Sequence, residues 1–176
     1  MRKRIWRVCA EWVSIIVGAL LIALVLKATV VQTFYIPSGS MLPTLEIGDR
    51  IVVSKMAFTL GEVERRDLAV FSKPPSLGDT EINDFIKRVI GLPGEEISSR
   101  NGQVYIDGKL LPEPYLQVGE FTSDLPTTKI PDDHYFVMGD NRKNSSDSRF
   151  FGPIPSNLLV GEPFIRIWPL SRFNFP

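Results

Sequence analysis

The sequence predicts a mainly β domain preceded by one N-terminal transmembrane helix. An uncharged apolar run fills residues 12–26 behind a basic N-terminus. From residue 34 onward, the hydrophobic residues fall in short β-branched or aromatic runs separated by Gly, Pro, Asn and Asp. No segment after residue 32 repeats its apolar residues with the 3.6-residue period of a helix. The 176 residues are enough for one domain with attachments.

The first 31 residues follow the pattern of a membrane anchor. Four basic residues, Arg2, Lys3, Arg4 and Arg7, precede the first acid. Residues 12–26 alone, at about 1.5 Å per residue, are shorter than a ~30 Å hydrocarbon core, so we expect the span to cover 8–31. A cleaved secretory signal and a buried helix of a soluble protein are the alternatives, although residues 26–32 offer no A-x-A cleavage site.

The positive-inside rule sets the expected topology. It keeps the basic residues 1–7 in the cytoplasm and places residues 32–176 outside as an extracytoplasmic catalytic domain. The predicted location is therefore the plasma (inner) membrane, crossed once, with the lipid bilayer as a partner.

Seven strands are predicted after the anchor, at residues 50–54, 68–71, 85–90, 96–99, 103–106, 135–138 and 163–168. Asn101-Gly102 and Asp107-Gly108 are typical of tight hairpin turns, so three short strands should form a local meander. Residues 112–131 are expected to be a long loop or a small insertion.

Composition excludes several functions. The 20 Lys and Arg balance 20 Asp and Glu, so no excess of positive charge indicates a nucleic-acid partner. One Cys excludes an internal disulfide, and one His, His134, leaves almost nothing for a histidine-built metal site. We predict no metal and no cofactor, and expect His134 to be structural.

Three segments are candidates for chemistry. In the first, residues 35–45, Ser38 and Ser40 flank Gly39 between two prolines, which suits either a nucleophile or a plain turn after the anchor. In the second, strand alternation places Lys87 between apolar neighbours, where burial would lower its pKa toward that of a general base. The alternative is an edge strand whose lysine points to water.

The third segment is the dense polar cluster at residues 139–149. If its later part is extended, Ser145, Asp147 and Arg149 share one face, so an ion pair would brace the loop while the hydroxyl orients a neighbour. An exposed polar turn is the alternative. A calcium loop is excluded because the spacing of its acids lacks the required register.

Together and in this order, these segments resemble the type I signal peptidases, membrane-bound Ser/Lys serine endopeptidases that remove signal peptides from exported preproteins. The likeness covers the anchor and four blocks, at residues 37–55, 65–71, 85–94 and 134–149. It implies a signal-peptidase-like (LexA-like) β fold. It also implies preprotein substrates with small residues at the −1 and −3 positions.

By matching position, the resemblance implies that Ser40 is the nucleophile and Lys87 its general base. Ser38 would join the Ser40 backbone N–H in the oxyanion hole, and Ser145 would hold the Lys87 amine in place. Asp147 and Arg149 would form a structural ion pair. The residues that would line the pockets for small side chains are Phe34, Ile36, Leu45 and Ile86.

Two residues depart from the family pattern. Arg66 stands where the family has Gly, which puts a tight turn there in question, and Lys143 stands where an Asp is common. Two other functions stay open: a self-cleaving Ser/Lys regulator, and a membrane-anchored β-rich binding or scaffold protein that is an inactive homologue. The first would carry a DNA-binding module, whereas this chain begins with an anchor.

Overall fold

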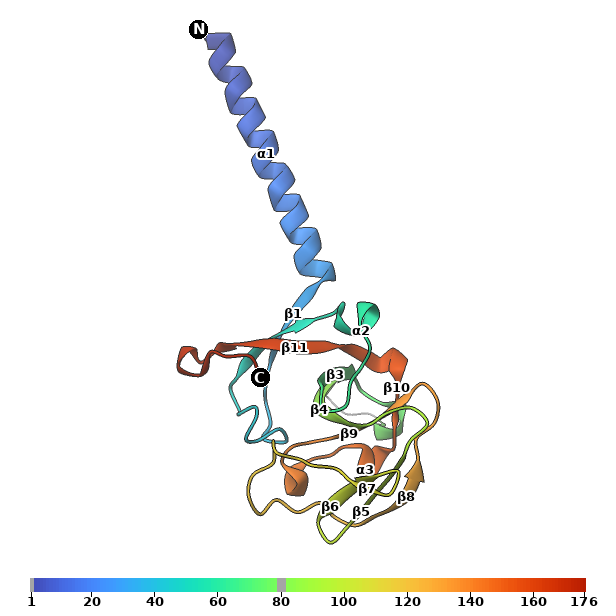
Figure 1. Ribbon diagram of the computed structural model, residues 1–176. Coiled ribbons are helices and arrows are strands. Elements are labelled where there is room, and N and C mark those ends of the chain that lie inside the picture. Colours follow the sequence, from blue (N-terminus) through green and yellow to red (C-terminus); the bar gives the residue numbers. More distant parts are fainter. Residues whose placement is uncertain (1, 79–81) are drawn as a thin grey trace.

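The computed structural model describes residues 2–78 and 82–176, without the side chains of residues 2–5, 7–10 and 26–28. Figure 1 shows a long helix, α1 (Arg2–Thr29), projecting from a domain made mainly of strands. Within the described part of the chain, no helix has the length and mean hydropathy needed to cross a membrane. The anchor at 8–31 therefore stays a prediction, and its last residue lies in the first strand rather than in the helix.

The larger sheet is antiparallel and has seven strands in the order β1-β2-β11-β3-β4-β9-β10. Its strands are β1 (Val31–Tyr35), β2 (Arg50–Ser54), β3 (Leu68–Ser72), β4 (Asp84–Gly91), β9 (His134–Met138), β10 (Ile154–Pro155) and β11 (Leu159–Trp168). Two short α-helices accompany it, α2 (Ala57–Leu60) and α3 (Ser148–Phe151). The 3₁₀ turns are η1 (Pro75–Leu77), η2 (Arg142–Asn144), η3 (Ser156–Leu158) and η4 (Leu170–Arg172).

A second sheet of four strands lies at the end of the domain away from α1 (Figure 1). Its order is β7-β6-β5-β8, formed by β5 (Glu96–Arg100), β6 (Gln103–Ile106), β7 (Lys109–Leu110) and β8 (Leu125–Lys129). The two predicted hairpin turns are confirmed, because Asn101-Gly102 and Asp107-Gly108 all have positive φ, as the tight primed turns require. The segment at 112–131, predicted as a long loop or a small insertion, contains strand β8.

One of the three buried clusters joins the two sheets. Ile90 of β4, Ile97 of β5 and Phe136 of β9 pack in one buried cluster that joins the sheets, and the other clusters fill the larger sheet. Strand β4 lies at this junction, and its alternate side chains enter different clusters: Ile86 packs on one, while Phe85 and Val89 pack on another. A cation within β4 is therefore held in a dry and rigid setting.

Strand β4 also has an incomplete neighbour. It pairs with β3 over residues 84–88, but β9 pairs with it only from Arg88 to Gly91, because β9 ends at Met138. Within the described chain, the outer edge of residues 84–87 therefore has no strand partner. This open edge lies beside the turn that follows β1.

Candidate active site

Ser40 lies in a turn that the core holds in place. After β1, the neighbours Met41 and Leu45 are both 0% exposed, and Leu45 N donates to Met41 O at 2.9 Å. Gly48 N and Ile36 O close the base of the turn at 2.9 Å. Because Met41 and Leu45 are anchored in the core and the base of the turn is bonded, the backbone that carries Ser40 is held in place although the turn is not part of a sheet.

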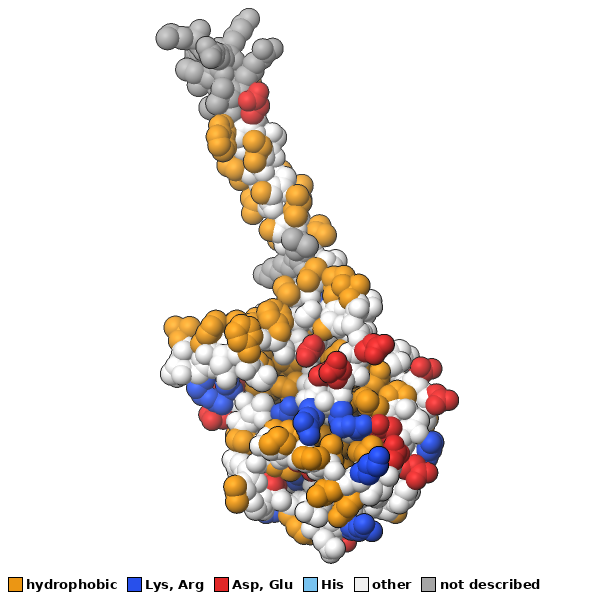
Figure 2. Space-filling model, viewed as in Figure 1, with side chains coloured by type: hydrophobic (Ala, Val, Ile, Leu, Met, Phe, Trp, Pro, Cys, Tyr) orange, Lys and Arg blue, Asp and Glu red, His pale blue; other side chains and the backbone are white. Residues whose placement is uncertain are grey.

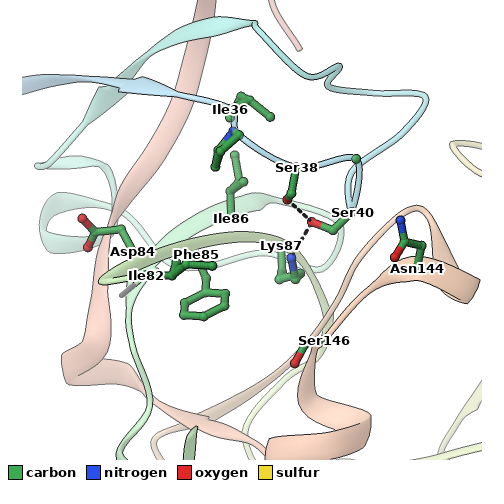
Figure 3. Close-up of a pocket in the computed structure, with 12 residues that line it drawn as sticks. Ile36, Ser38, Ser40, Ile82, Asp84, Phe85, Ile86, Lys87, Asn144 and Ser146 are labelled. Atoms are coloured by element: carbon green, nitrogen blue, oxygen red, sulfur yellow. Dashed lines mark hydrogen bonds between the residues drawn. The ribbon is translucent and has the colours of Figure 1, made fainter. Parts of the chain in front are cut away.

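Lys87 comes to Ser40 from β4. The Lys87 side chain is buried, and its Nζ donates to Ser40 Oγ at 2.7 Å, which joins residues 47 positions apart in the sequence. Ser38 Oγ lies 3.5 Å from Ser40 Oγ on the other side. Figure 3 shows these three side chains converging at one end of a cleft.

The surroundings of Lys87 increase the fraction of its amine that is neutral. Burial lowers the pKa of Lys87 to about 8, and the nearby carboxylates of Asp147 and Asp140 oppose part of that shift. An ordinary lysine is almost wholly protonated at neutral pH, whereas at a pKa of about 8 roughly a tenth of the amines are neutral at pH 7. A neutral amine in contact with a hydroxyl is able to accept its proton.

The loop at residues 139–147 closes the site from the opposite side. Asn141 N donates to Ser40 O at 3.1 Å, and Asn141 Nδ2 donates to Gly39 O at 3.0 Å. Asp147 accepts from Gly139 N at 3.0 Å and pairs with Arg149 Nη2 at 2.8 Å. The loop is therefore fixed internally through Asp147 and tied to the nucleophile turn through Asn141 and through Asp140, which accepts from the Thr44 hydroxyl.

Gly139 is required by close packing. A Cβ at this position would lie 2.2 Å from Ser145 Oγ and 2.5 Å from Ser40 O. The backbone of the loop approaches the serine turn so closely that any side chain would push the two apart.

Ser145 does not make the predicted bond. Its hydroxyl is buried, packs against Gly139, and has no hydrogen-bond partner among the described residues, so the orienting contact to Lys87 is absent from this structure. The same loop instead acts on β4 through Asp140, which accepts from Arg88 Nε at 2.8 Å and from Arg88 Nη2 at 2.6 Å.

A cleft of about 250 Å³ has the side chains of Ser40 and Lys87 in its wall. Its other lining residues come from the serine turn, from β4 and the residues just before it, and from the 139–147 loop: Ile36, Pro37, Ser38, Gly39, Ile82, Asp84, Phe85, Ile86, Asn144 and Ser146. Asn144 and Ser146 were not predicted as site residues. A smaller neighbouring pocket of about 40 Å³ is lined by Phe34, Ile36 and Ile86, among others.

Three of the four predicted pocket residues therefore lie at these cavities. Leu45 does not, because it is fully buried in the core cluster beneath the serine turn. Its apolar character serves the anchoring of that turn rather than the pocket wall.

The two departures from the family pattern are accommodated. Arg66 keeps a glycine-like conformation, with φ of 83°, and its Nη2 donates to Pro112 O at 2.8 Å. Lys143 is exposed on η2. His134 contacts a backbone oxygen, with Nδ1 2.9 Å from Asp132 O. No grouping of metal-binding side chains occurs among the residues that the structure describes.

The sequence predicted the Asp147–Arg149 pair but not two other ion pairs around the site. The Arg88–Asp140 pair and a second pair, Arg142 Nη2 to Glu113 Oε1 at 2.5 Å, link segments far apart in the chain. A signal was present, because an arginine in a buried strand or loop needs a carboxylate partner. The identity of that partner was not readable from local sequence.

Comparison with known proteins assigns the family. Residues 9–168 match the family described as "Signal peptidase, peptidase S26". The chain is 42% identical over 157 residues to a probable signal peptidase I-2 of Synechocystis sp., covering 89% of this chain and 72% of that protein. It is 36% identical over 170 residues to a signal peptidase I of Bacillus caldolyticus, covering 89% and 90%. A solved signal peptidase I of Enterococcus faecalis is 32% identical, covers 57% of this chain and 96% of that one, and has a TM-score of 0.49. The chain therefore belongs to the signal peptidase family, peptidase S26.

Proposed function

We propose that this protein is a membrane-bound serine endopeptidase that removes N-terminal signal peptides from exported preproteins, with Ser40 as nucleophile and Lys87 as general base. The observation that carries the proposal is the 2.7 Å contact between the buried Lys87 amine and the Ser40 hydroxyl, in a chain of the signal peptidase family. Lowering of the Lys87 pKa to about 8 by burial supports the role of base.

The reaction follows from this pair. The neutral amine takes the hydroxyl proton as Ser40 Oγ bonds to the scissile carbonyl carbon, and the oxyanion that forms is stabilised by the Ser38 hydroxyl and the Ser40 backbone N–H. The protonated amine then gives its proton to the leaving peptide nitrogen, which leaves an acyl-enzyme. A water, deprotonated by the same lysine, adds to the ester and releases the signal peptide.

The cleft fits an extended peptide with small side chains. A substrate strand is able to pair with the open edge of β4 at residues 84–87, which directs alternate side chains toward the two pockets. The −1 and −3 side chains lie on the same face of an extended peptide, so one is able to enter the cleft beside Ser40 and the other the smaller pocket, whose volume of about 40 Å³ favours a small side chain. Phe34, Ile36 and Ile86 supply its apolar walls.

Helix α1 is proposed as the anchor, with residues 1–7 in the cytoplasm and the catalytic domain, from residue 32, outside. Figure 2 shows apolar side chains exposed along the helix and gathered on the end of the domain next to it, a distribution that suits the lipid bilayer. Trp12, Leu20 and Val25 are all exposed on the helix. Resistance of the full chain to alkaline extraction from membranes tests the anchor, and its release by that treatment would contradict it.

Cleavage of a reporter preprotein by the full chain in lipid vesicles tests the chemistry. We expect Ser40→Ala and Lys87→Ala each to reduce cleavage to background, while circular dichroism of the folded domain is retained. Ser98→Ala and Lys109→Ala, in the second sheet, are matched controls that should cleave normally. Retained cleavage by either test variant would remove that residue from the mechanism.

A further inference from the structure

The segment between β7 and β8 binds Arg142 of the loop at 139–147, which closes the active site. Glu113 forms two bonds to Arg142, Oε1 to Nη2 at 2.5 Å and Oε2 to Nη1 at 3.1 Å. The Thr122 hydroxyl accepts from Arg142 Nη1 at 2.7 Å. The Arg142 side chain is 0% exposed and the Glu113 side chain 8%, so the pair is shielded from water.

Arg142 also bonds the backbone that packs against the turn carrying Ser40. Its Nε donates to Gly139 O at 3.0 Å. Gly139 is the residue whose backbone packs directly against Ser40 O and the Ser145 hydroxyl. A shift of the Arg142 guanidinium therefore moves the backbone on which Ser40 rests.

A second contact of the same segment leads to Arg88, the neighbour of Lys87. Tyr115 donates its hydroxyl to Glu113 Oε1 at 2.7 Å, and its ring lies 4.2 Å from the Arg88 guanidinium carbon. Arg88 is adjacent to Lys87 in β4. The same short segment therefore contacts both Arg142, which bonds the backbone beside Ser40, and Arg88, which adjoins Lys87.

We propose that Glu113 is a positioning residue for the Ser40–Lys87 pair, acting through Arg142, and that residues 112–123 form a clamp between the second sheet and the active site. The inference rests on the proposed function. A buried guanidinium that loses its carboxylate draws in water or moves, because an unpaired charge is costly in a dry site. Small displacements at a reacting pair lower the rate of chemistry far more than they weaken substrate binding.

The test is steady-state cleavage of a reporter preprotein by the full chain in lipid vesicles, well below the unfolding temperature of each variant. We expect Glu113→Gln to lower kcat by about 100-fold with KM changed less than threefold. Glu113→Asp should recover part of kcat, because the charge returns. The matched control is Glu95→Gln, which breaks a bidentate pair with Arg65 whose shortest distance is also 2.5 Å. In this pair Arg65 donates to Ile90 O and Glu95 accepts from Leu92 N, so neither side chain bonds the loop at 139–147. The Glu95→Gln protein should retain kcat within twofold.

A double variant tests the route. If Glu113 acts through Arg142, Glu113→Gln with Arg142→Met should lose no more kcat than Arg142→Met alone. Additive losses would overturn the proposed route, and a folded Glu113→Gln protein with kcat within twofold of the parent would overturn the role itself.

The same assay also covers a Glu113→Gln protein that does not fold and a parent chain that does not cleave. If Glu113→Gln fails to fold, Thr122→Val decides, since it removes one hydroxyl from Arg142: a kcat loss of about tenfold at constant KM supports the clamp, and a normal kcat overturns it. A parent chain that cleaves nothing would contradict the proposed function together with this inference. Normal cleavage by both the parent and Glu113→Gln would contradict the clamp alone.

Discussion

Replacing Lys87 by Met should stabilise the folded protein at neutral pH while it abolishes cleavage. Methionine fills a similar volume with a flexible apolar chain, so position 87 stays filled and buried while the charge is removed. The substitution therefore separates the cost of holding an amine in a dry site from the packing of β4.

The size of the effect follows from the pKa of Lys87. Burial lowers it from 10.5 to about 8. Since one pKa unit corresponds to about 1.4 kcal/mol, the protonated amine destabilises the fold by roughly 3 kcal/mol at pH 7. Loss of the hydrogen bond to Ser40 offsets about 1 kcal/mol. The net gain of about 2 kcal/mol should raise the unfolding midpoint by roughly 4–8 °C for a chain of this size.

The gain should depend on pH with a definite sign. Between about pH 8 and 10.5, the unfolded chain keeps the Lys87 proton that the folded chain has lost. The unfolded state then binds more protons, so the stability of the parent rises with pH across this window. The advantage of Lys87→Met should therefore be full below pH 8 and gone by about pH 10.5.

Thermal unfolding of the full chain in detergent, followed by near-ultraviolet circular dichroism over this pH range, measures the effect. Lys109→Met, at an exposed position of β7, is the control and should leave the midpoint unchanged. A Lys87→Met protein that unfolds at a lower temperature than the parent at pH 7, or a difference that does not vary with pH, would show that the buried amine does not destabilise the fold.

Three other substitutions have defined outcomes. Gly139→Ala should abolish cleavage and lower the midpoint of thermal unfolding, because its Cβ would lie 2.5 Å from Ser40 O; normal activity would contradict the close packing. Asp147→Asn should shift the acid limb of the pH–rate profile below about pH 8, since this carboxylate raises the pKa of Lys87, and should cost about 3–5 kcal/mol in a urea titration by breaking a buried pair. An upward shift would be inconsistent with that charge effect. Ile86→Ala should let a panel of signal peptides with larger −1 or −3 residues be cut, and unchanged selectivity would remove Ile86 from the pocket wall.

Local sequence patterns were sufficient for most of the strands. The alternation in residues 50–54 and 103–106 matched β2 and β6, because apolar side chains on one face of a strand reflect a nearby core. Strand β1 was missed because its first residue was assigned to the anchor. Strand β8 was missed because Pro126 and polar residues resemble a loop, and its pairing with β5 is set by tertiary packing.

The site was predictable only where its residues carried a local signal. Lys87 is conspicuous in an apolar strand, and Ser40 lies in an unusual turn. The contacts that hold them are long-range: Glu113 and Arg142 are 29 residues apart, and Arg88 and Asp140 are 52 apart. Which carboxylate meets which buried arginine depends on how the two sheets pack, and no local pattern encodes that.

The most direct test of the central claim is the pH dependence of Ser40 acylation by a serine-directed probe, followed by intact mass and peptide mapping in the full chain. We expect a single modification at Ser40, whose rate rises about tenfold per pH unit and levels off near pH 8, and no modification in Lys87→Met. Labelling at another residue, or a rate at Ser40 that does not change when Lys87 is replaced, would contradict the roles of Ser40 as nucleophile and Lys87 as its base.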